Sequence, residues 1–177
     1  MRVLVGYASA HGSTREIAEH VGARLARHGL ETEVAALGRV VGTAEFDAYV
    51  LGSAVHDQRW LPEARAFVDE HAPDLAAKPV WLFSVGMPDA LRWPLPGLAR
   101  VLQPPALVAE LAGRVSIRDH VVVSGVVRSE HLPLLGRVAM LLLTRGAGDY
   151  RDWPRIDAWA DGVARVLTAL PRPRGRP

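Results

Sequence analysis

The feature of this sequence that most constrains its fold is a regular alternation between short apolar runs and amphipathic segments. Apolar runs with little polar alternation are typical of parallel strands buried on both faces, and they lie at residues 2–6, 33–37, 48–53, 79–85 and 120–127. Helical periodicity occupies residues 13–28, 61–72 and 154–170. Because a strand–helix–strand unit closes as a right-handed crossover, this order predicts an α/β fold, with a five-stranded parallel sheet and helices on both faces.

Two segments lie outside this regular plan. Residues 89–114 form a long connection broken by prolines, and residues 128–150 precede the last helix. We see no linker that would separate a second core, so we predict one domain over residues 1–170. The remaining residues, 171–177, are rich in proline and arginine, and we expect them to form a disordered basic tail.

The composition excludes several classes of site. The chain has no cysteine, which excludes disulfides, thiolate metal sites and a cysteine nucleophile, and we expect no metal site. Its 21 basic and 19 acidic residues give a net charge of +2, and part of the basic excess falls in the tail. Because the remaining body is near neutral, with no clustered basic face, nucleic acid is not an expected partner.

The most apolar stretch, residues 132–143, needs a separate interpretation. It contains Pro133, Gly136 and Arg137 and is shorter than the about 20 residues needed to cross a bilayer. As a helix, it can be buried against the sheet, form a homodimer interface or contact a membrane surface, and burial is the favoured interpretation. No targeting segment is visible, so we expect a cytoplasmic protein, with peripheral contact at the inner face of the membrane as the alternative.

A turn rich in small and hydroxyl side chains, residues 7–14, joins the first strand to the first helix. In a doubly wound sheet ligands bind beyond the carboxyl ends of the strands, so the hydroxyls of Ser9, Ser13 and Thr14 and nearby backbone N–H groups can surround a phosphate. The turn matches neither a GxGxxG loop nor a lysine-containing phosphate loop, which favours a phosphate monoester over a dinucleotide or nucleoside triphosphate. The alternative is an ordinary helix start, in which Ser13 and Glu16 form a capping box.

Two further turns follow the third and fourth strands. Residues 52–60 begin with small side chains and end at Trp60, which we expect to be exposed and whose flat ring is a candidate cover for a planar ligand. The alternative is that Trp60 fastens the start of the next helix to the core. In residues 84–89, Gly86 lets the backbone approach a ring closely, although an ordinary turn would use a glycine in the same way.

Together, the three turns resemble those of the flavodoxin family, over about residues 1–170. The sequence YASAHGSTREIA is similar to that family's phosphate loop for FMN, and LGSAVHDQRW and FSVGMP are similar to its two isoalloxazine loops. The resemblance implies a three-layer sandwich with strand order 2-1-3-4-5 and FMN as the cofactor. It also implies that FMN is bound by Ser9, Ala10, His11, Gly12, Ser13, Thr14, Ser53, Ala54, Val55, Trp60, Ser84, Val85, Gly86 and Met87.

Within that family, the sequence resembles most the quinone-dependent protoporphyrinogen oxidases. The resemblance rests on GSAVHDQRWLPEARAFV after the third strand, on GDYRDWPRIDAWA at the start of the last helix, and on the extra segment before it. It implies an FMN-dependent oxidoreductase of heme biosynthesis that dehydrogenates a porphyrinogen and passes electrons to a quinone. Two features depart from the pattern: His11 replaces a threonine–glycine type of residue, and residues 89–114 lack the basic motifs expected of a substrate site.

Other functions remain open or can be excluded. A flavodoxin-type electron carrier would dock a redox partner protein and have no substrate of its own, and a flavin-free interaction module would have kept only the fold. A response-regulator receiver domain shares the strand order, but it needs carboxylates after the first strand, an aspartate ending the third and a lysine ending the fifth. Those positions hold Tyr7-Ala8-Ser9, Gly52-Ser53 and Val126-Val127, so the receiver is excluded.

The charges in the turns favour an enzyme over a low-potential carrier. Carriers of that type surround the flavin with carboxylates, which repel a negatively charged reduced flavin. Here Asp57 and Asp89 are balanced by Arg59 and Arg92, and this mixed set suits a two-electron dehydrogenase.

Two histidines in these turns, His11 and His56, can move a proton near neutral pH. We select His56 as the candidate catalytic residue. The commoner alternative for either is an ordinary solvent-exposed histidine, because sequence alone does not establish hydrogen-bond geometry.

Overall fold

The computed structural model describes residues 1–86, 111, 113–127 and 146–171. Its centre is a sheet of parallel strands in the order β2-β1-β3-β5-β6. These strands are β1 (Arg2–Ala8), β2 (Glu31–Ala36), β3 (Ala48–His56), β5 (Val80–Gly86) and β6 (Ile117–Ser124). Counted along the chain, this order is the expected 2-1-3-4-5, so the prediction of the sheet is confirmed.

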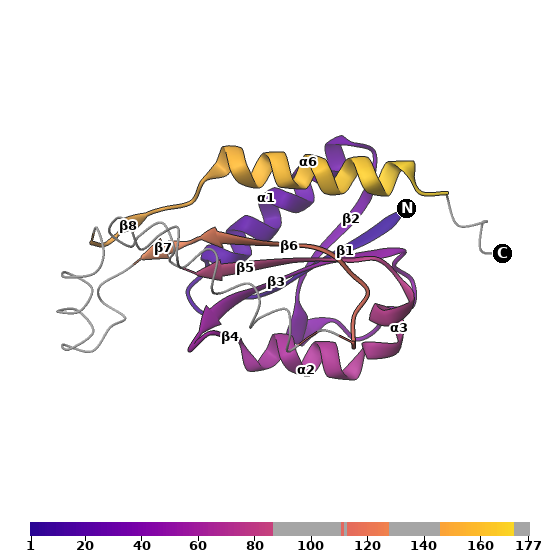
Figure 1. Cartoon of the computed structure of the whole chain (residues 1–177), viewed down its shortest axis with the longest axis horizontal. Coiled ribbons are helices and arrows are strands. Elements are labelled where there is room, and N and C mark those ends of the chain that lie inside the picture. Colours follow the sequence, from indigo (N-terminus) through magenta and orange to yellow (C-terminus); the bar gives the residue numbers. More distant parts are fainter. Residues whose placement is uncertain (87–110, 112, 128–145, 172–177) are drawn as a thin grey trace.

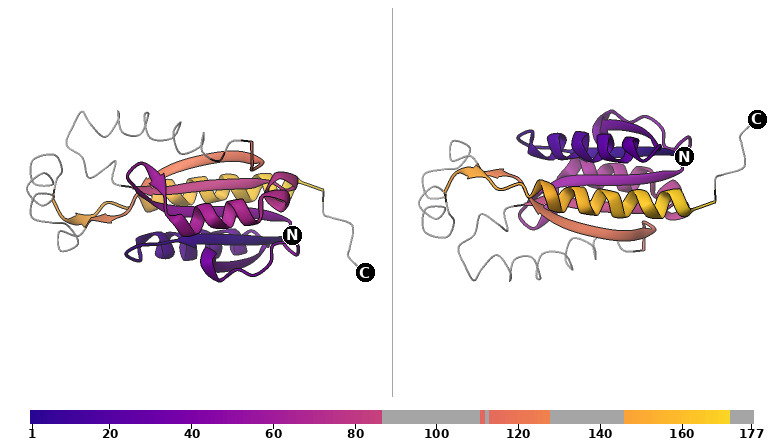
Figure 2. Two further views of the ribbon diagram at one scale, coloured as in Figure 1. Left: turned by 90° about the horizontal axis from the view of Figure 1, so that it is seen from below. Right: turned by 90° about the horizontal axis from the view of Figure 1, so that it is seen from above.

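Helices cover both faces of the sheet (Figures 1 and 2). Two long helices, α1 (Ser13–Arg27) and α6 (Trp153–Ala169), pack on one face, and α2 (Pro62–Glu70) and α3 (Ala72–Ala77) pack on the other. Because successive strand residues point to opposite faces, Val3 and Val5 join the core under α1 and α6, while Leu4 joins the core under α2. The three-layer sandwich follows directly from this alternation.

The helices form where the sequence places their apolar stripes. Ile17, Val21 and Leu25 recur every fourth residue of α1, and all three are buried against the sheet. The helix ends at Arg27, and Gly29, the expected stop, follows two residues later with a φ of 78°. This left-handed conformation suits glycine and lets the N–H of Gly29 bond the carbonyl of Ala26.

The edge strands differ most from the sequence-based boundaries. We expected a strand at 33–37, but β2 begins at Glu31 and gives way at Leu37 to a short 3-10 helix, η1 (Leu37–Arg39). The criterion of an apolar run misses the start of an edge strand, whose side chains face water. Instead, ion pairs hold it: Arg2 of β1 lies 2.8 Å from Glu33 and 3.5 Å from Glu31.

The expected fifth strand, 120–127, is divided in two. The strand β6 begins earlier, at Ile117, and ends at Ser124, and Gly125 separates it from β7 (Val126–Val127). This second strand pairs antiparallel with β8 (Gly148–Asp149), and the two-stranded ribbon extends beyond the carboxyl edge of the main sheet (Figure 1). The ribbon therefore leads directly from that edge to the start of α6.

Several sequence-based expectations fall outside the described residues. Most of residues 89–114, the apolar stretch 132–143 with its three interpretations, and the tail after residue 171 are among them. Within the described parts of the chain, no helix combines the length and the apolar character needed to cross a membrane.

Candidate functional site

The candidate site lies at the carboxyl edge of the sheet, where β1, β3 and β5 end. The strand β1 pairs with β2 on one side and β3 on the other, so the connection from β2 to β3 runs back past β1 in the direction opposite to the connection from β1 to β2. In open parallel sheets such a reversal leaves a crevice between neighbouring loops, which is where ligands bind. The loops that follow β1, β3 and β5 therefore lie at the edge where ligands bind in folds of this type.

The turn after β1 ends in an uncapped helix. Gly12 is the residue before α1, with a φ of 93°, and no side chain of the described residues caps the helix. The predicted capping box of Ser13 and Glu16 is therefore wrong: Ser13 is already the first helical residue. The reason is the left-handed backbone at Gly12, which advances the helix start by one residue and leaves Ser9 to accept a hydrogen bond from the N–H of Gly12 at 3.0 Å.

Thr14 is the polar side chain that points most clearly to a ligand. It is completely buried, and its hydroxyl has no hydrogen-bond partner among the described residues. Leaving a buried hydroxyl unpaired costs about 1–3 kcal/mol. The first-turn N–H groups of α1 also have no acceptor within the helix. These unsatisfied donors lie at the positive end of the helix dipole, and a phosphate provides the acceptor oxygens that they need.

The loops after β1 and β6 meet beside this helix start. A Cβ added to Gly125 would lie 3.0 Å from the Ser13 hydroxyl and 2.9 Å from a methyl group of Val85. A larger residue at this position would force these side chains to shift. The structure thus brings Ser9, Gly12, Ser13 and Thr14 together with the ends of β5 and β6, while Ala10 and His11 are exposed.

The turn after β3 is a tight hairpin rather than the open loop that we expected. The strand β3 continues to His56 and pairs antiparallel with β4 (Arg59–Trp60), joined by Asp57 and Gln58. Both linking residues have positive φ, of 48° and 61°, as a two-residue hairpin turn of this twist requires. Ala54 and Val55 are half-buried, and the tip is exposed.

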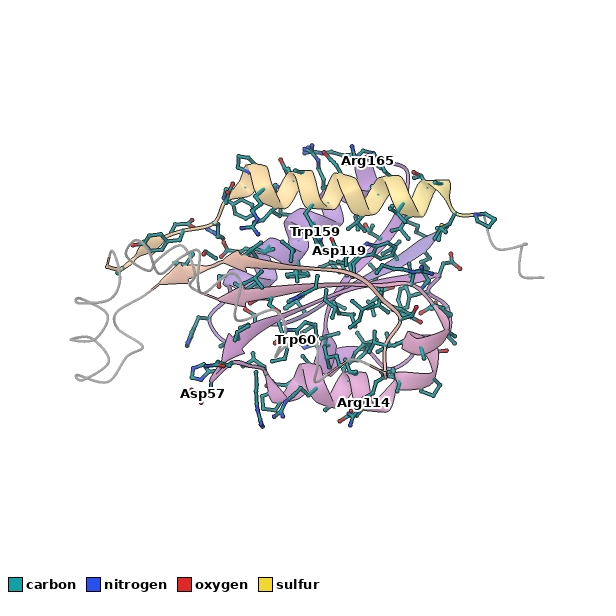
Figure 3. All side chains as sticks on the ribbon, in the orientation of Figure 1. Asp57, Trp60, Arg114, Asp119, Trp159 and Arg165 are labelled. Carbon is teal, nitrogen blue, oxygen red and sulfur yellow. The ribbon has the colours of Figure 1, made fainter. Side chains whose placement is uncertain are left out.

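His56 lies on this exposed tip. Its Nδ1 atom is 3.8 Å from a carboxylate oxygen of Asp57, and the Asp57 side chain is 99% exposed. Figure 3 shows Asp57 at the outer end of the hairpin. This position exposes the His56 side chain to solvent.

The expectation that Trp60 is exposed is wrong. Its side chain is 3% exposed and packs in the core under α2, and its Nε1–H donates to the hydroxyl of Ser84 at 2.8 Å (Figure 3). The hairpin turns the chain back at Gln58, and this reversal directs the indole inward. The alternative interpretation, in which Trp60 fastens the start of the next helix to the core, describes the structure correctly.

The two serines that we assigned to the flavin loops are also bonded internally. The hydroxyl of Ser53 accepts from the N–H of Leu61 at 3.0 Å and donates to the carbonyl of Ala54 at 2.8 Å. Ser84 contacts Trp60 and His120. Near the ends of β3 and β5, Ala54, Val55 and the backbone of Gly86 remain available to a ring, whereas Val85 is 5% exposed. Met87 lies outside the described residues.

His120 is a polar residue of this region that the sequence analysis missed. Its Nε2 atom lies 2.8 Å from the Ser84 hydroxyl, which completes a chain of contacts from Trp60 to His120. Burial lowers the pKa of His120, although Asp119 acts in the opposite direction. The Nδ1 atom is buried and has no partner among the described residues. Placed at the start of an apolar run, this histidine gave no separate signal.

The geometry defines a class of protein: a three-layer α/β protein whose first strand–helix turn has an uncapped helix start and a buried, unpartnered hydroxyl. The sequence matches the flavodoxin domain family over residues 4–153, which is more than half of the chain. The chain therefore belongs to the flavodoxin family. No curated protein matches the sequence.

Solved structures with a similar fold include flavodoxins and a larger oxidoreductase. A cysteine-to-serine mutant of flavodoxin from Pseudomonas aeruginosa has a TM-score of 0.61 and 13% identity, with 96% of this chain and 100% of that chain covered. Oxidised flavodoxin 2 from Bacillus cereus has a TM-score of 0.59 and 17% identity, with 95% and 99% covered. Rubredoxin oxygen:oxidoreductase from Desulfovibrio gigas has a TM-score of 0.58 and 15% identity, with 95% of this chain and 36% of that chain covered.

Family membership gives FMN as the cofactor. The buried hydroxyl of Thr14 and the uncapped start of α1 fit its phosphate, which is the test that the structure itself supplies. The coarser part of the functional expectation, a flavoprotein with a redox role, agrees with these matches. They do not point to the protoporphyrinogen oxidase branch that the sequence motifs resemble.

Proposed function

We propose that this protein is an FMN-dependent oxidoreductase that exchanges electrons with a second redox partner through FMN bound at the carboxyl edge of the sheet. The observation that carries the proposal is the completely buried, unpartnered hydroxyl of Thr14 at the uncapped start of α1. An interaction module that had lost its ligand would have no reason to keep a buried donor unsatisfied, since this costs stability.

In this proposal the phosphate is held by neutral donors. Backbone N–H groups of the first turn of α1 and the hydroxyls of Ser13 and Thr14 donate to it. Ser9 acts from behind, because its bond to the N–H of Gly12 fixes the turn before the ligand arrives. A turn already in its binding conformation loses little conformational freedom on binding.

The ring would lie between the ends of β3 and β5. Ala54 and Val55 offer small or apolar contacts, and Gly86 offers backbone close to the ring. When bound, FMN supplies the hydride and electron chemistry, and the protein orients it and controls access by water. The buried hydrogen bond between Trp60 and Ser84 would hold the end of β5 in place from the α2 face of the sheet.

We further propose that the substrate is a porphyrinogen-like compound and the acceptor a quinone. In each turnover the substrate would lose two hydrogens and one quinone would be reduced to a quinol. The support is the resemblance of two sequence segments to quinone-dependent protoporphyrinogen oxidases and the mixed charge of the hairpin tip, where Asp57 lies in the turn and Arg59 follows it. A tip lined only with carboxylates would disfavour a negatively charged reduced flavin.

The alternative is a flavodoxin-type electron carrier without a substrate of its own, which the flavodoxin matches favour. An anaerobic assay separates the two. An enzyme of the proposed type reduces menadione with protoporphyrinogen in many turnovers. A carrier shows no such turnover but accelerates electron transfer from a flavodoxin reductase to cytochrome c. The second result without the first would overturn the porphyrinogen proposal and leave the FMN proposal intact.

His56 is the residue we propose to move a proton in the enzyme. Replacing it with glutamine should lower the rate by about a hundredfold or more, since general acid–base catalysis contributes roughly 10²–10⁴. FMN content and the unfolding temperature should stay unchanged, because the side chain is exposed. The matched control is Gln58→Asn in the same hairpin tip. Equal rates in both variants would show that His56 is an ordinary surface histidine.

A further inference from the structure

A carboxylate lies close to the proposed phosphate position. Glu16 is four residues after Gly12, in the first turn of α1, and its backbone N–H bonds the carbonyl of Gly12 at 3.0 Å. With a rise of about 1.5 Å per residue, it is only about 6 Å along the helix axis from Gly12. A carboxylate suits the end of an empty helix, but it repels a phosphate dianion that binds at the same end.

A guanidinium from a distant part of the chain neutralises this carboxylate. Arg151, between β8 and α6, forms an ion pair with Glu16. It also bonds Asp149, at 2.9 Å through Nε and 2.6 Å through Nη2. Its guanidinium lies 4.8 Å from the centre of the Trp153 ring. The side chain is 12% exposed, so it is fixed between two carboxylates and an aromatic face.

The backbone also ties Arg151 to the site. The N–H of Tyr150 bonds the carbonyl of Gly125 at 3.2 Å, and the N–H of Gly125 bonds the carbonyl of Gly86 at 3.0 Å. Gly125 in turn lies beside the Ser13 hydroxyl. Arg151 therefore keeps a defined position relative to the start of α1 and the end of β5. Its carboxylate neighbours raise the pKa of Arg151 and the guanidinium lowers the pKa of Asp149, as expected of a tight ion cluster.

We infer that Arg151 is a positioning residue that determines the preference of the site for a phosphorylated flavin, by neutralising Glu16 beside the phosphate. The inference rests on the proposed FMN site. Arg151 need not touch the phosphate. The cluster of Glu16, Arg151 and Asp149 carries one net negative charge. Without the charge of Arg151, the cluster would carry two.

The test measures dissociation constants for FMN and riboflavin, which differ only in the phosphate, by quenching of flavin fluorescence. Arg151→Gln should raise the dissociation constant for FMN by about tenfold, which lies between the effects of a charge pair in bulk water and at a protein surface. The dissociation constant for riboflavin should change by no more than about twofold. Arg151→Lys should keep FMN affinity near that of the wild type. Glu16→Gln should tighten FMN, and the double variant Glu16→Gln with Arg151→Gln should return to the wild-type value.

Two controls complete the design. Arg114→Gln removes an arginine from an exposed ion pair with Asp69 and should change neither affinity; Figure 3 shows Arg114 beside α2, on the opposite face of the sheet from α1. Inorganic phosphate, which needs only the start of α1, is the second probe. The affinity for phosphate should be lower in Arg151→Gln than in the wild type, and the double variant should regain the wild-type affinity. The losses should shrink in 0.5 M salt, where the Debye length falls to about 4 Å.

Each remaining outcome counts against the inference. An equal loss for FMN and riboflavin, with no recovery in the double variant, would show that Arg151 only holds the chain in shape. Unchanged FMN and phosphate binding in Arg151→Gln would show that Glu16 does not act on the phosphate. Failure of the proposed function looks different, because the wild-type protein itself would then bind neither FMN nor phosphate.

Discussion

The β1–α1 turn and the β3–β4 hairpin lie at the same edge of the sheet, yet their polar groups are satisfied differently. In the hairpin region, Ser53, Trp60 and Ser84 all bond partners within the protein. In the β1–α1 turn, the Thr14 hydroxyl has no partner in the described part of the chain, and the helix start is uncapped. The hairpin therefore stabilises the edge, whereas the turn keeps unsatisfied donors, which we propose are completed by a ligand.

The largest expected effect is a loss of stability when a buried side chain of the hairpin region is removed. Trp60→Ala should lower the free energy of unfolding of the flavin-free protein by about 3–5 kcal/mol, because it leaves a cavity and removes the donor to Ser84. Urea unfolding followed by circular dichroism measures this loss. Stability equal to that of the wild type, with a loss of FMN affinity alone, would mean that the ring acts on the ligand.

The turn should respond in the opposite way. Thr14→Val keeps the shape of the buried side chain and removes the unpartnered hydroxyl, so the flavin-free protein should become more stable by about 1 kcal/mol. FMN affinity should fall by about tenfold to a hundredfold, from the loss of one hydrogen bond to a charged group worth about 1.5–3 kcal/mol.

Two further variants sharpen this prediction. Ser9→Ala combined with Thr14→Val should weaken FMN beyond Thr14→Val alone, because the N–H of Gly12 loses its acceptor. Thr168→Val is the matched control, since that hydroxyl already donates to the carbonyl of Ala164 at 2.9 Å. Unchanged FMN binding in the double variant would place the phosphate elsewhere.

The smallest effect is a pH dependence carried by His120. Burial lowers its pKa in the folded protein below the ordinary value of 6.5, so the unfolded chain takes up the proton first as the pH falls. The stabilisation is therefore complete above about pH 6.5 and decreases below it, by at most about 1.4 kcal/mol per pH unit for one group. His120→Gln should flatten the unfolding free energy between pH 6.5 and 5. An unchanged slope would contradict this role.

Much of the fold can be predicted from the sequence, because apolar runs and helical stripes report burial directly. The stripe of Ile156, Val163 and Leu167 placed α6 to within one residue at each end. Edge strands escape this criterion because one side of them faces solvent, as the start of β2 at Glu31 shows. Ion pairs with Arg2 hold that start, and a single sequence does not reveal such long-range partners.

The positions of the candidate turns could be predicted from the sequence, whereas their local geometry could not. The turn after β1 lies where the first apolar run ends, as expected, but Ser13 does not cap the helix, since the left-handed backbone at Gly12 has no separate signature in a small-residue turn. The hairpin was missed because Asp57 and Gln58 adopt positive φ without a glycine. That turn buries Trp60, and no local pattern distinguishes a tryptophan directed inward from one directed at a ligand.

The central claim is that the uncapped start of α1 and the hydroxyl of Thr14 bind the phosphate of FMN. The most direct test is the visible absorption spectrum of the purified protein, with mass spectrometry of the chromophore released on denaturation. We expect a flavin spectrum and the release of FMN, with the flavin lost more easily from Thr14→Val. A colourless protein that takes up no added FMN would contradict it.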